Sequence, residues 1–471
     1  MNSDEFRAAG HRLIDWIADY RATIESRPVM AQTAPGAIKA KLPATPPQHP
    51  ESFDAVLRDL DAIVLPGITT WQHPRFFGYF PSNGLYASLL GDYVSSGLGV
   101  IGLAWQSSPA LTEVEEVVVD WMRQMLGLSD GWSGVINDTA STSTLVALLC
   151  ARERTTNYGL ARGGLQEEAA PLVIYATAHS HSSVEKAALL AGFGKRHVRI
   201  VPHDSSHAMR PESLENMIKD DVANGLKPCA VVATTGTTTT TALDPLAAIA
   251  KVAKAHDVWM HVDAAMAGSA MILPECRWMW DGVEGADSLI VNAHKWLGAV
   301  FDCTVYFVRD PEHLVRVMST NPSYLQTAAD GRVKNYRDWG LPLGRRFRAL
   351  KLWFLIREQG VDGLQERLRR DIDNAKWLEQ QISADPQWKV LAPVVLQTLC
   401  VRHEPGGLLG DALDKHTLGW VARLNESGAA YLTPAMLDGQ WMARVSIGAE
   451  LTEREHVAQL WDLMREQVAR D

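Results

Sequence analysis

The chain has 471 residues, with 45 Lys and Arg against 55 Asp and Glu, and a formal net charge of -10. Such an acidic chain disfavours nucleic acid or an anionic membrane as a partner, because either would need a basic face that displaces counterions. With 46% hydrophobic and 21% charged residues, the composition is that of a globular protein with a large core and not of a disordered one.

The first residues show no sign of export. They lack the basic and apolar regions of a signal peptide, and no window approaches about eighteen unbroken apolar residues. The five cysteines are scattered, and no C-x-x-C pair is present to hold zinc or exchange disulfides. The sequence therefore predicts a soluble cytoplasmic protein with no membrane segment and no metal site.

The N-terminal region is predicted to be an appendage. Apolar residues recur at helical spacing over residues 5–24, so one face of that helix must lie on something larger. Six prolines between Pro28 and Pro50 then exclude a helix interior or a central strand and favour an extended arm. Residues 1–80 are expected to pack on another surface, namely a second subunit.

A helix and a parallel sheet are predicted next. Ser108 is a candidate N-cap, Pro109 occupies the first turn, and Gly127 ends the apolar helical pattern. Segments with helical periodicity, such as residues 246–255, separate short β-rich runs, which favours an α/β fold with a mostly parallel sheet covered on both faces. These runs are residues 172–175, 230–233, 258–262, 289–291 and 304–308.

From Gly340 onward the chain turns basic and helical. In an acidic protein, a solvated helix face or a subunit contact is favoured over a polyanion site for these arginines and lysines. Beyond residue 365 a helix, short strands and a final helix from Glu453 indicate a small α+β domain. The predicted division is thus 1–80, a large domain at 81–365, and 366–471.

Polar residues follow three of the predicted strands, where ligands of open α/β sheets bind. Asp263 ends one strand, although an acid there is also a common helix cap. Lys295 follows the next strand, where an amine is costly unless it is bonded or paired. The third strand leads into hydroxyls at 234–238 of the kind that a phosphate or phenolate oxygen binds.

A lysine and an aspartate on neighbouring strand ends are what a pyridoxal 5'-phosphate (PLP) enzyme requires. The amine bonds covalently to the cofactor aldehyde, and the carboxylate keeps the pyridine nitrogen protonated so that the ring accepts electrons. The alternative is a structural salt bridge between Lys295 and Asp263. Thr139-Ala140-Ser141, ahead of an apolar helical run, would supply hydroxyls and backbone N–H groups for the phosphate.

Two details near this site remain open. The carboxylate of Asp138 would repel a phosphate and must point away, toward backbone N–H groups. Of His179 and His181, one imidazole could stack on a planar cofactor and the other could be a surface or capping residue.

At this point the residues resemble a known family, the group II PLP-dependent decarboxylases, in the branch of the aromatic L-amino-acid decarboxylases, over essentially the whole chain. The order and spacing of the motifs carry the resemblance. The matching stretches are Phe76 to Pro81, Thr139 to Ser141, His181 to Glu185, Gly236 to Thr239, His261 to Ala265, Asn292 to Trp296 and Leu343 to Arg348.

The resemblance implies a fold of the aspartate aminotransferase type (fold type I) and a homodimer with its active site at the subunit interface. It implies that Lys295 holds PLP covalently, that Asp263 pairs with the ring nitrogen, and that His181 stacks on the ring. The other implied cofactor-binding residues are Thr139, Ala140, Ser141, Thr238, Asp244, Ala265, Asn292 and His294. The implied substrate-binding residues are Trp71, Tyr79, Phe80, Pro81 and Gly344, with Ile101 and Leu103 from the partner chain.

The resemblance also implies a reaction. Tyr336 matches the tyrosine that protonates the substrate Cα after carbon dioxide leaves, on a polar segment, residues 331–339, with the character of a mobile lid. This favours decarboxylation of an aromatic L-amino acid (DOPA, tryptophan, 5-hydroxytryptophan, tyrosine or phenylalanine) to its amine. The alternatives are an aromatic aldehyde synthase, a decarboxylase of a non-aromatic amino acid, and a catalytically silent PLP-binding protein. Met266, where most relatives have Tyr, and Asp138, where many have Gly, depart from the family pattern.

Overall fold

The computed structural model describes residues 1–320, 323 and 329–470. The chain forms two compact units, each assembled from separate stretches of sequence. Unit 1 comprises Met1–Pro81, Asp373–Leu391 and Leu399–Asp471, and unit 2 comprises Ser82–Ile372 and Ala392–Thr398. The division into an N-terminal appendage, a large domain and a small C-terminal domain stays a prediction.

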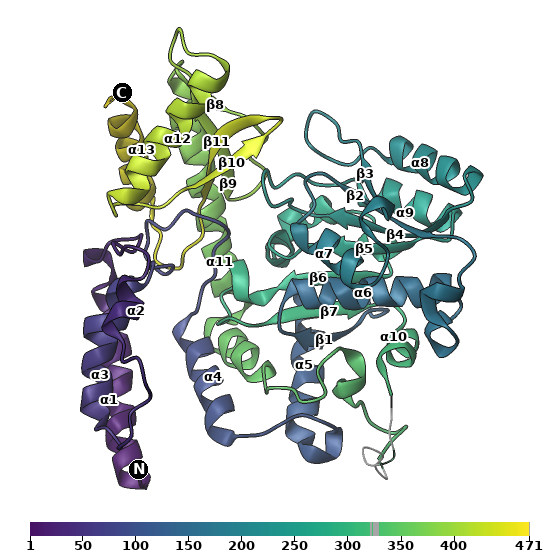
Figure 1. Ribbon diagram of the computed structural model, residues 1–471, viewed down its shortest axis with the longest axis horizontal. Coiled ribbons are helices and arrows are strands. Elements are labelled where there is room, and N and C mark those ends of the chain that lie inside the picture. The colour runs from purple at the N-terminus through teal and green to yellow at the C-terminus, as the bar shows by residue number, and fades with distance from the viewer. Residues whose placement is uncertain (321–322, 324–328, 471) are drawn as a thin grey trace. The chain divides into compact units, whose positions relative to one another are not determined.

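Unit 2 is built on a seven-stranded sheet with the order β1-β7-β6-β5-β4-β2-β3 (Figure 1). β7 runs antiparallel to its neighbours β1 and β6, and the remaining neighbouring pairs are parallel. The strands are β1 (Ser133–Asn137), β2 (Leu172–Thr177), β3 (Val198–Val201), β4 (Lys227–Thr234), β5 (Trp259–Asp263), β6 (Ser288–Asn292) and β7 (Thr304–Val308). The five predicted strands are confirmed, and β1 and β3 are additional.

Helices cover both faces of this sheet. The chain moves in one direction across the sheet through α6 (Ala140–Thr155) and α7 (Ser182–Leu190), and in the other direction through α8 (Pro211–Ala223) and α9 (Leu246–Ala255). Because parallel crossovers are right-handed, the two pairs of helices lie on opposite faces. The direction reverses between β4 and β2, and a crevice for ligands forms beyond the carboxyl ends of strands at such a point.

The remaining helices of unit 2 include α5, the helix whose start at Ser108 and Pro109 was predicted from the sequence. α5 (Pro109–Met125) begins after Ser108, whose side chain accepts a hydrogen bond from the backbone N–H of Leu111, and has proline in its first turn, as predicted. The others are α4 (Tyr86–Leu98), α10 (Pro311–Met318) and the first part of α11 (Ala349–Ala384), which departs from helical geometry at Gly360. No helix among the described residues has both the length and the apolar character needed to span a membrane.

Unit 1 pairs a four-stranded antiparallel sheet with helices. The sheet has the order β10-β11-β9-β8. Its strands are β8 (Trp388–Val390), β9 (Thr398–His403), β10 (Thr433–Leu437) and β11 (Gln440–Ser446), and its helices include α12 (Gly410–Glu426) and α13 (Arg454–Val468). Glu453 is the N-cap of α13, so the predicted start of the final helix is confirmed.

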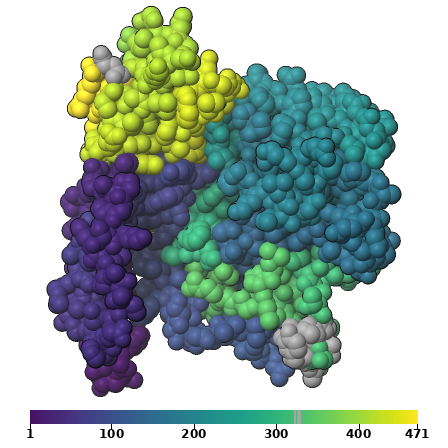
Figure 2. Space-filling model, viewed as in Figure 1, coloured from purple at the N-terminus to yellow at the C-terminus, as the bar shows by residue number. Residues whose placement is uncertain are grey.

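The N-terminal segment of unit 1 is more helical than expected. α1 (Ser3–Ala22) lies alongside α3 (Phe53–Asp59), and Arg12 forms an ion pair with Asp54 (Figure 1). The expectation of a wholly extended arm is wrong, because α2 (Ala37–Lys41) fits between two prolines. None of the residues of α1 is buried. Figure 2 shows the N-terminal segment, in purple, exposed on the surface.

The basic stretch after Gly340 is solvated only in part. The side chains of Arg346 and Arg369 are 50% and 42% exposed, so the expectation of a solvated face holds for these two arginines and fails for three other basic residues. The side chains of Arg345, Lys351 and Arg367 are buried in unit 2. Arg345 binds Glu115 at 2.6 Å, and Lys351 lies 3.0 Å from Asp92. These charges are therefore neutralised by internal partners, as buried charges require.

We expect the replacement of Glu115 by alanine to lower the free energy of unfolding by about 3–5 kcal/mol, because it leaves a buried guanidinium unpaired. One carboxylate oxygen of Glu115 accepts hydrogen bonds from Arg345 Nη2 at 2.6 Å and from the backbone N–H of Ile136 at 2.8 Å. Urea unfolding of the PLP-loaded protein measures the loss. Glu215→Ala, which breaks an exposed pair with Lys219, is the control and should change stability little. Equal effects of the two substitutions would contradict the buried pair.

Candidate active site

The candidate site begins at two neighbouring strand ends in unit 2. Asp263 is the last residue of β5 and pairs in register with Ile290 of β6, which ends two residues later at Asn292. Lys295 follows in a short π-helical turn, Ala293–Leu297. Asp263 is buried, and its Oδ1 accepts the backbone N–H of Ala265 at 3.0 Å. Lys295 is half-buried and follows the strand that pairs with the one ending in Asp263.

The turn that carries Lys295 is held firmly. Lys295 has non-helical angles, φ -93° and ψ -111°, inside the turn, which ends at Gly298 with φ +104°. A Cβ at Gly298 would lie 2.4 Å from a side-chain carbon of Leu85, so only glycine fits. Arg367 donates hydrogen bonds to the carbonyl oxygens of Trp296 and Leu297, at 2.5 and 2.7 Å. These contacts fix the position from which the lysine side chain starts.

The structure places His179 and His181 in different surroundings, which the sequence alone did not distinguish. His181 is the N-cap of α7, and its Nδ1 accepts the backbone N–H of Ser183 at 3.1 Å. Although its side chain reaches solvent, burial lowers the pKa of His181, while the charge of Asp263 raises it and that of Lys295 lowers it. His181 is therefore within electrostatic reach of both groups. His179 lies instead against two other histidines.

Hydroxyl and amide groups gather at the start of α6. Thr139 is the N-cap of this helix, and Ser141 is exposed in its first turn. Thr304 links this turn to β6, because its hydroxyl donates to Asn292 Oδ1 at 2.8 Å or to the carbonyl oxygen of Asp138 at 3.2 Å. Asp138 Oδ1 accepts the backbone N–H of Thr139 at 2.6 Å. The acid thus bonds to a backbone donor, as expected from sequence.

Two further predicted residues are braced by backbone groups. Nδ1 of His294 lies 2.9 Å from both the N and the O of Cys303, and burial lowers the pKa of His294 to about 4, with a further lowering from Lys295. The carboxylate of Asp244 accepts backbone N–H groups of Met209 and Thr234, each at 2.7 Å, and burial raises its pKa to about 6. Asp244 therefore fixes the loop after β4, on which Thr238 lies.

The predicted aromatic residues of unit 1 form one stack. The rings of Trp71 and Tyr79 lie 5.3 Å apart and nearly parallel, with Phe76 4.7 Å from Trp71. Tyr431, which sequence reasoning missed, stacks on Phe76 at 5.4 Å. A Cβ at Gly78 would lie 2.3 Å from its ring. Phe80 packs under the guanidinium of Arg444 at 4.1 Å, and Pro81 follows it.

The predicted aliphatic residues meet in unit 2. A Cβ at Gly344 would lie 3.4 Å from Ile101 Cγ2 and 3.9 Å from Leu103 Cδ2, so the glycine leaves room beside both side chains. The backbone N–H of Gly102 donates to the carbonyl oxygen of Arg345 at 2.9 Å, which holds the two segments together. Ile101 is 60% exposed.

Tyr336 packs in the interior of unit 2. It begins a 3-10 turn, Tyr336–Trp339, and its ring is buried in the core of unit 2, 5.4 Å from the ring of Trp339. The guanidinium of Arg345 lies 4.9 Å from the ring centroid. Within the described chain its hydroxyl has no hydrogen-bond partner, and burial, with Glu115 and Glu116, raises the pKa of Tyr336 well above its usual value. This hydroxyl therefore forms no hydrogen bond to Lys295.

Met266 is the residue that departs from the tyrosine found in most members of the resembling family. Its side chain is buried, and Gln397 Nε2 lies 3.4 Å from its sulfur. Sequence analysis did not single out Thr304 or Tyr431. A threonine at the start of a strand and a tyrosine in a loop carry no local signal. Pairing between distant segments places Thr304 beside Asn292 and Tyr431 beside Phe76.

The donor set fits PLP. An amine and a carboxylate stand at adjacent strand ends, and an imidazole lies within electrostatic reach of both. Hydroxyls and free N–H groups at the start of α6 suit a phosphate. With a mostly parallel sheet and a crevice at the reversal of strand order, these groups define a PLP-dependent enzyme of fold type I.

Comparisons with known proteins agree with this class. Residues 35–404 match the model of the pyridoxal-dependent decarboxylase conserved domain, and the chain belongs to this family. It is 40% identical to phenylacetaldehyde synthase from Arabidopsis thaliana over 100% of this chain and 97% of the relative, and 39% identical to tryptophan decarboxylase 2 from Oryza sativa subsp. japonica over 100% and 96%.

A solved structure gives the same result. The crystal structure of Oryza sativa TDC with PLP and tryptamine aligns with a TM-score of 0.97 and 36% identity, covering 100% of this chain and 99% of that one. The predicted family, fold class and cofactor are therefore confirmed, and PLP is the cofactor of this enzyme.

Proposed function

We propose that the enzyme removes the carboxylate of an aromatic L-amino acid and releases the amine and carbon dioxide. The observation that carries the proposal is the adjacency of Lys295 and Asp263 at the ends of β6 and β5, with the imidazole of His181 within electrostatic reach of both. The substrate class is supported by relatives whose names specify tryptophan and phenylacetaldehyde, both aromatic, and which match the whole chain.

Each polar group has a proposed role. Bound PLP supplies an electron sink for the pair released when the bond between Cα and the carboxylate breaks. Lys295 holds the cofactor through its amine, and Asp263 keeps a proton on the ring nitrogen. The imidazole of His181 covers the ring face. The hydroxyls of Thr139 and Ser141 bind the phosphate.

Neighbouring groups complete the proposed cofactor site. The backbone N–H groups of Ala140 and Ser141 have no partner within the helix and are proposed to donate to the phosphate. Asn292 and His294 support the phosphate from the end of β6, where Thr304 and Cys303 hold their side chains. Thr238 and Ala265 line the remaining edge of the ring, and Asp244 positions the loop of Thr238.

The substrate side chain is proposed to bind between aromatic and aliphatic surfaces. Trp71, Tyr79, Phe80 and Pro81 provide flat apolar surface of the kind on which an indole or phenol ring stacks. Ile101 and Leu103 of a second copy close the pocket, and the missing side chain at Gly344 leaves space beside them. This space is compatible with indole as well as catechol rings.

A homodimer is the proposed assembly. On α4 the side chains of Tyr86, Leu90, Tyr93, Val94 and Leu98 are each 38–57% exposed and recur at helical spacing, which makes one apolar stripe. α1 likewise buries none of its residues. A second copy of the chain that covers α4 and α1 would remove this apolar surface from water.

A reducing compartment such as the cytoplasm is the proposed location. All five cysteines are buried as free thiols. Burial raises the pKa of Cys229 and of Cys303 to about 12, so neither forms a reactive thiolate at neutral pH. No pair among the described residues is joined by a disulfide.

A product assay tests the reaction. The PLP-loaded protein is incubated with tryptophan, 5-hydroxytryptophan, tyrosine, DOPA and phenylalanine, and with glutamate and histidine as non-aromatic controls. We expect amine and carbon dioxide in equal amounts from at least one aromatic substrate, and no amine from the controls. An aldehyde synthase would instead consume oxygen and release aldehyde, ammonia and hydrogen peroxide. Amine from glutamate or histidine alone would overturn the proposed substrate class.

A further inference from the structure

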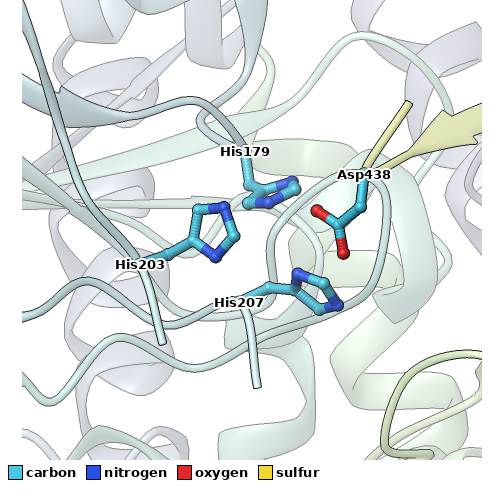
Figure 3. Close-up of side chains that lie close together, drawn as sticks. All are labelled: His179, His203, His207 and Asp438. Atoms are coloured by element: carbon cyan, nitrogen blue, oxygen red, sulfur yellow. The ribbon is translucent and has the colours of Figure 1, made fainter. Parts of the chain in front are cut away.

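Three histidines outside the proposed catalytic groups converge in unit 2. His179 follows β2, and His203 and His207 follow β3. The ring of His179 lies 4.6 Å from that of His203 and 5.0 Å from that of His207, and the latter two rings are 5.4 Å apart. One nitrogen of each ring lies within 4.8 Å of the others. Figure 3 shows the three rings gathered around a common space. Asp438, also drawn, belongs to unit 1 and is not part of this histidine cluster.

The loop after β3 holds two of these rings in place. Asp204 accepts backbone N–H groups of Ser206 and Ala208 on its Oδ1, at 2.8 and 3.0 Å, and its own N–H donates to the carbonyl oxygen of Ala208 at 2.9 Å. His207 sits in this tight turn with φ +63°, a conformation that costs a histidine free energy. The turn directs a buried imidazole toward the other two rings.

The orientation of His203 suits a metal ligand. Its Nδ1 lies 2.9 Å from the carbonyl oxygen of Asp204, so this nitrogen donates its proton and Nε2 keeps a lone pair. A hydrogen bond from one ring nitrogen to a backbone carbonyl is the usual way in which proteins orient a histidine that binds metal through the other. His179 and His203 are half-buried, which leaves an approach for an ion from solvent.

We propose that His179, His203 and His207 form a binding site for a divalent transition-metal ion, with Zn²⁺ as the representative ion. Three imidazole ligands favour zinc over Mg²⁺ or Ca²⁺, which prefer oxygen ligands. Nitrogen ligands at about 2.0–2.1 Å from tetrahedral zinc lie roughly 3.3 Å from one another. Binding would therefore draw the ring nitrogens together from their present separations of up to 4.8 Å.

The site would connect two loops at the edge of the cofactor crevice. His179 precedes His181 by two residues on the loop between β2 and α7. An ion bound to all three histidines would tie this loop to the loop after β3. Because the ion binds the folded chain, it should also raise the melting temperature of the protein.

Calorimetric titration with Zn²⁺ tests the site. The protein carries no polyhistidine tag, is saturated with PLP and is freed of metal with EDTA before dialysis. We expect one equivalent of Zn²⁺ to bind with a dissociation constant of about 1 μM or tighter, no detectable binding of Mg²⁺, and a higher melting temperature with Zn²⁺ alone. Failure of Zn²⁺ to bind at 100 μM protein, a concentration of about 100 times that constant, would overturn the proposal.

Variants assign the ion to these side chains. His203→Ala and His207→Asn should each weaken Zn²⁺ binding at least about tenfold and abolish the rise in melting temperature; asparagine is chosen at 207 because it tolerates positive φ. His49→Ala, at an exposed histidine of unit 1, is the control and should bind Zn²⁺ normally. The absorption of bound PLP reports that each variant is folded. Unchanged affinity in both site variants would place the ion elsewhere and refute the site.

Discussion

Lys295→Ala is expected to abolish decarboxylation, with kcat lower by roughly 10⁴-fold or more. Removing a nucleophile that binds the cofactor covalently also removes the orientation that the bond enforces, and the loss in rate is on this scale. The turn Ala293–Leu297 is fixed through Gly298 and through Arg367, so loss of the amine should not disturb the backbone. Amine production under saturating PLP measures the rate. Borohydride reduction and peptide mass analysis should find PLP attached at Lys295 in the parent protein and no attached PLP in the variant.

A second lysine substitution serves as a control, because it distinguishes loss of the cofactor bond from nonspecific loss of folding. Lys186 is exposed on α7, a few residues after His181, and Lys186→Ala should retain both activity and the attached cofactor. Retention of activity by Lys295→Ala, or reductive labelling of a different lysine, would show that the proposed amine does not hold PLP. Measuring both turnover and PLP attachment in the parent protein also tests the alternative of a catalytically silent PLP-binding protein. That alternative predicts PLP attached at Lys295 but no turnover.

Much of the sheet could be read from the sequence because its central strands are short apolar runs that end in polar residues. Asp263 and Lys295 stand out for that reason: an acid and an amine directly after buried strands need a partner. β1 and β3 were missed because their sequences lack that contrast: β1 contains serine, glycine and asparagine, and three of the four residues of β3 are not buried. Local pattern detects a strand buried on both faces better than one at an edge.

Interactions between distant segments explain the rest of the differences. The arginines and lysines after Gly340 have the sequence pattern of a solvated helix, yet Arg345 and Lys351 find carboxylates on α5 and α4. The three histidines near β2 and β3 are another example. His179 and His207 are separated by a helix and a strand in the chain, so no motif reveals that their rings meet. Such contacts depend on the fold and not on local spacing.

Tyr336→Phe is expected to change the product. As the proposed general acid, Tyr336 returns a proton to the substrate Cα, a contribution of about 10²–10⁴-fold in rate, so amine formation should fall by at least about 100-fold. Oxygen would then react in place of the proton, giving aldehyde, ammonia and hydrogen peroxide. Quantified amine, aldehyde and peroxide from the preferred aromatic substrate measure the switch. Unchanged amine output would remove the proton-donor role.

The observed position of Tyr336 makes this substitution unusually informative. The hydroxyl is buried in unit 2 with no hydrogen-bond partner among the described residues, so phenylalanine removes no bond and should keep or raise stability. A loss of amine would then reflect chemistry and not unfolding. It would also require the segment Gly331–Trp339 to leave the core during turnover, since the hydroxyl must reach the substrate to protonate it. Tyr306→Phe, a buried substitution in β7, controls for core changes and should leave the product an amine. If both variants lose amine equally, Tyr336 acts through packing in the core.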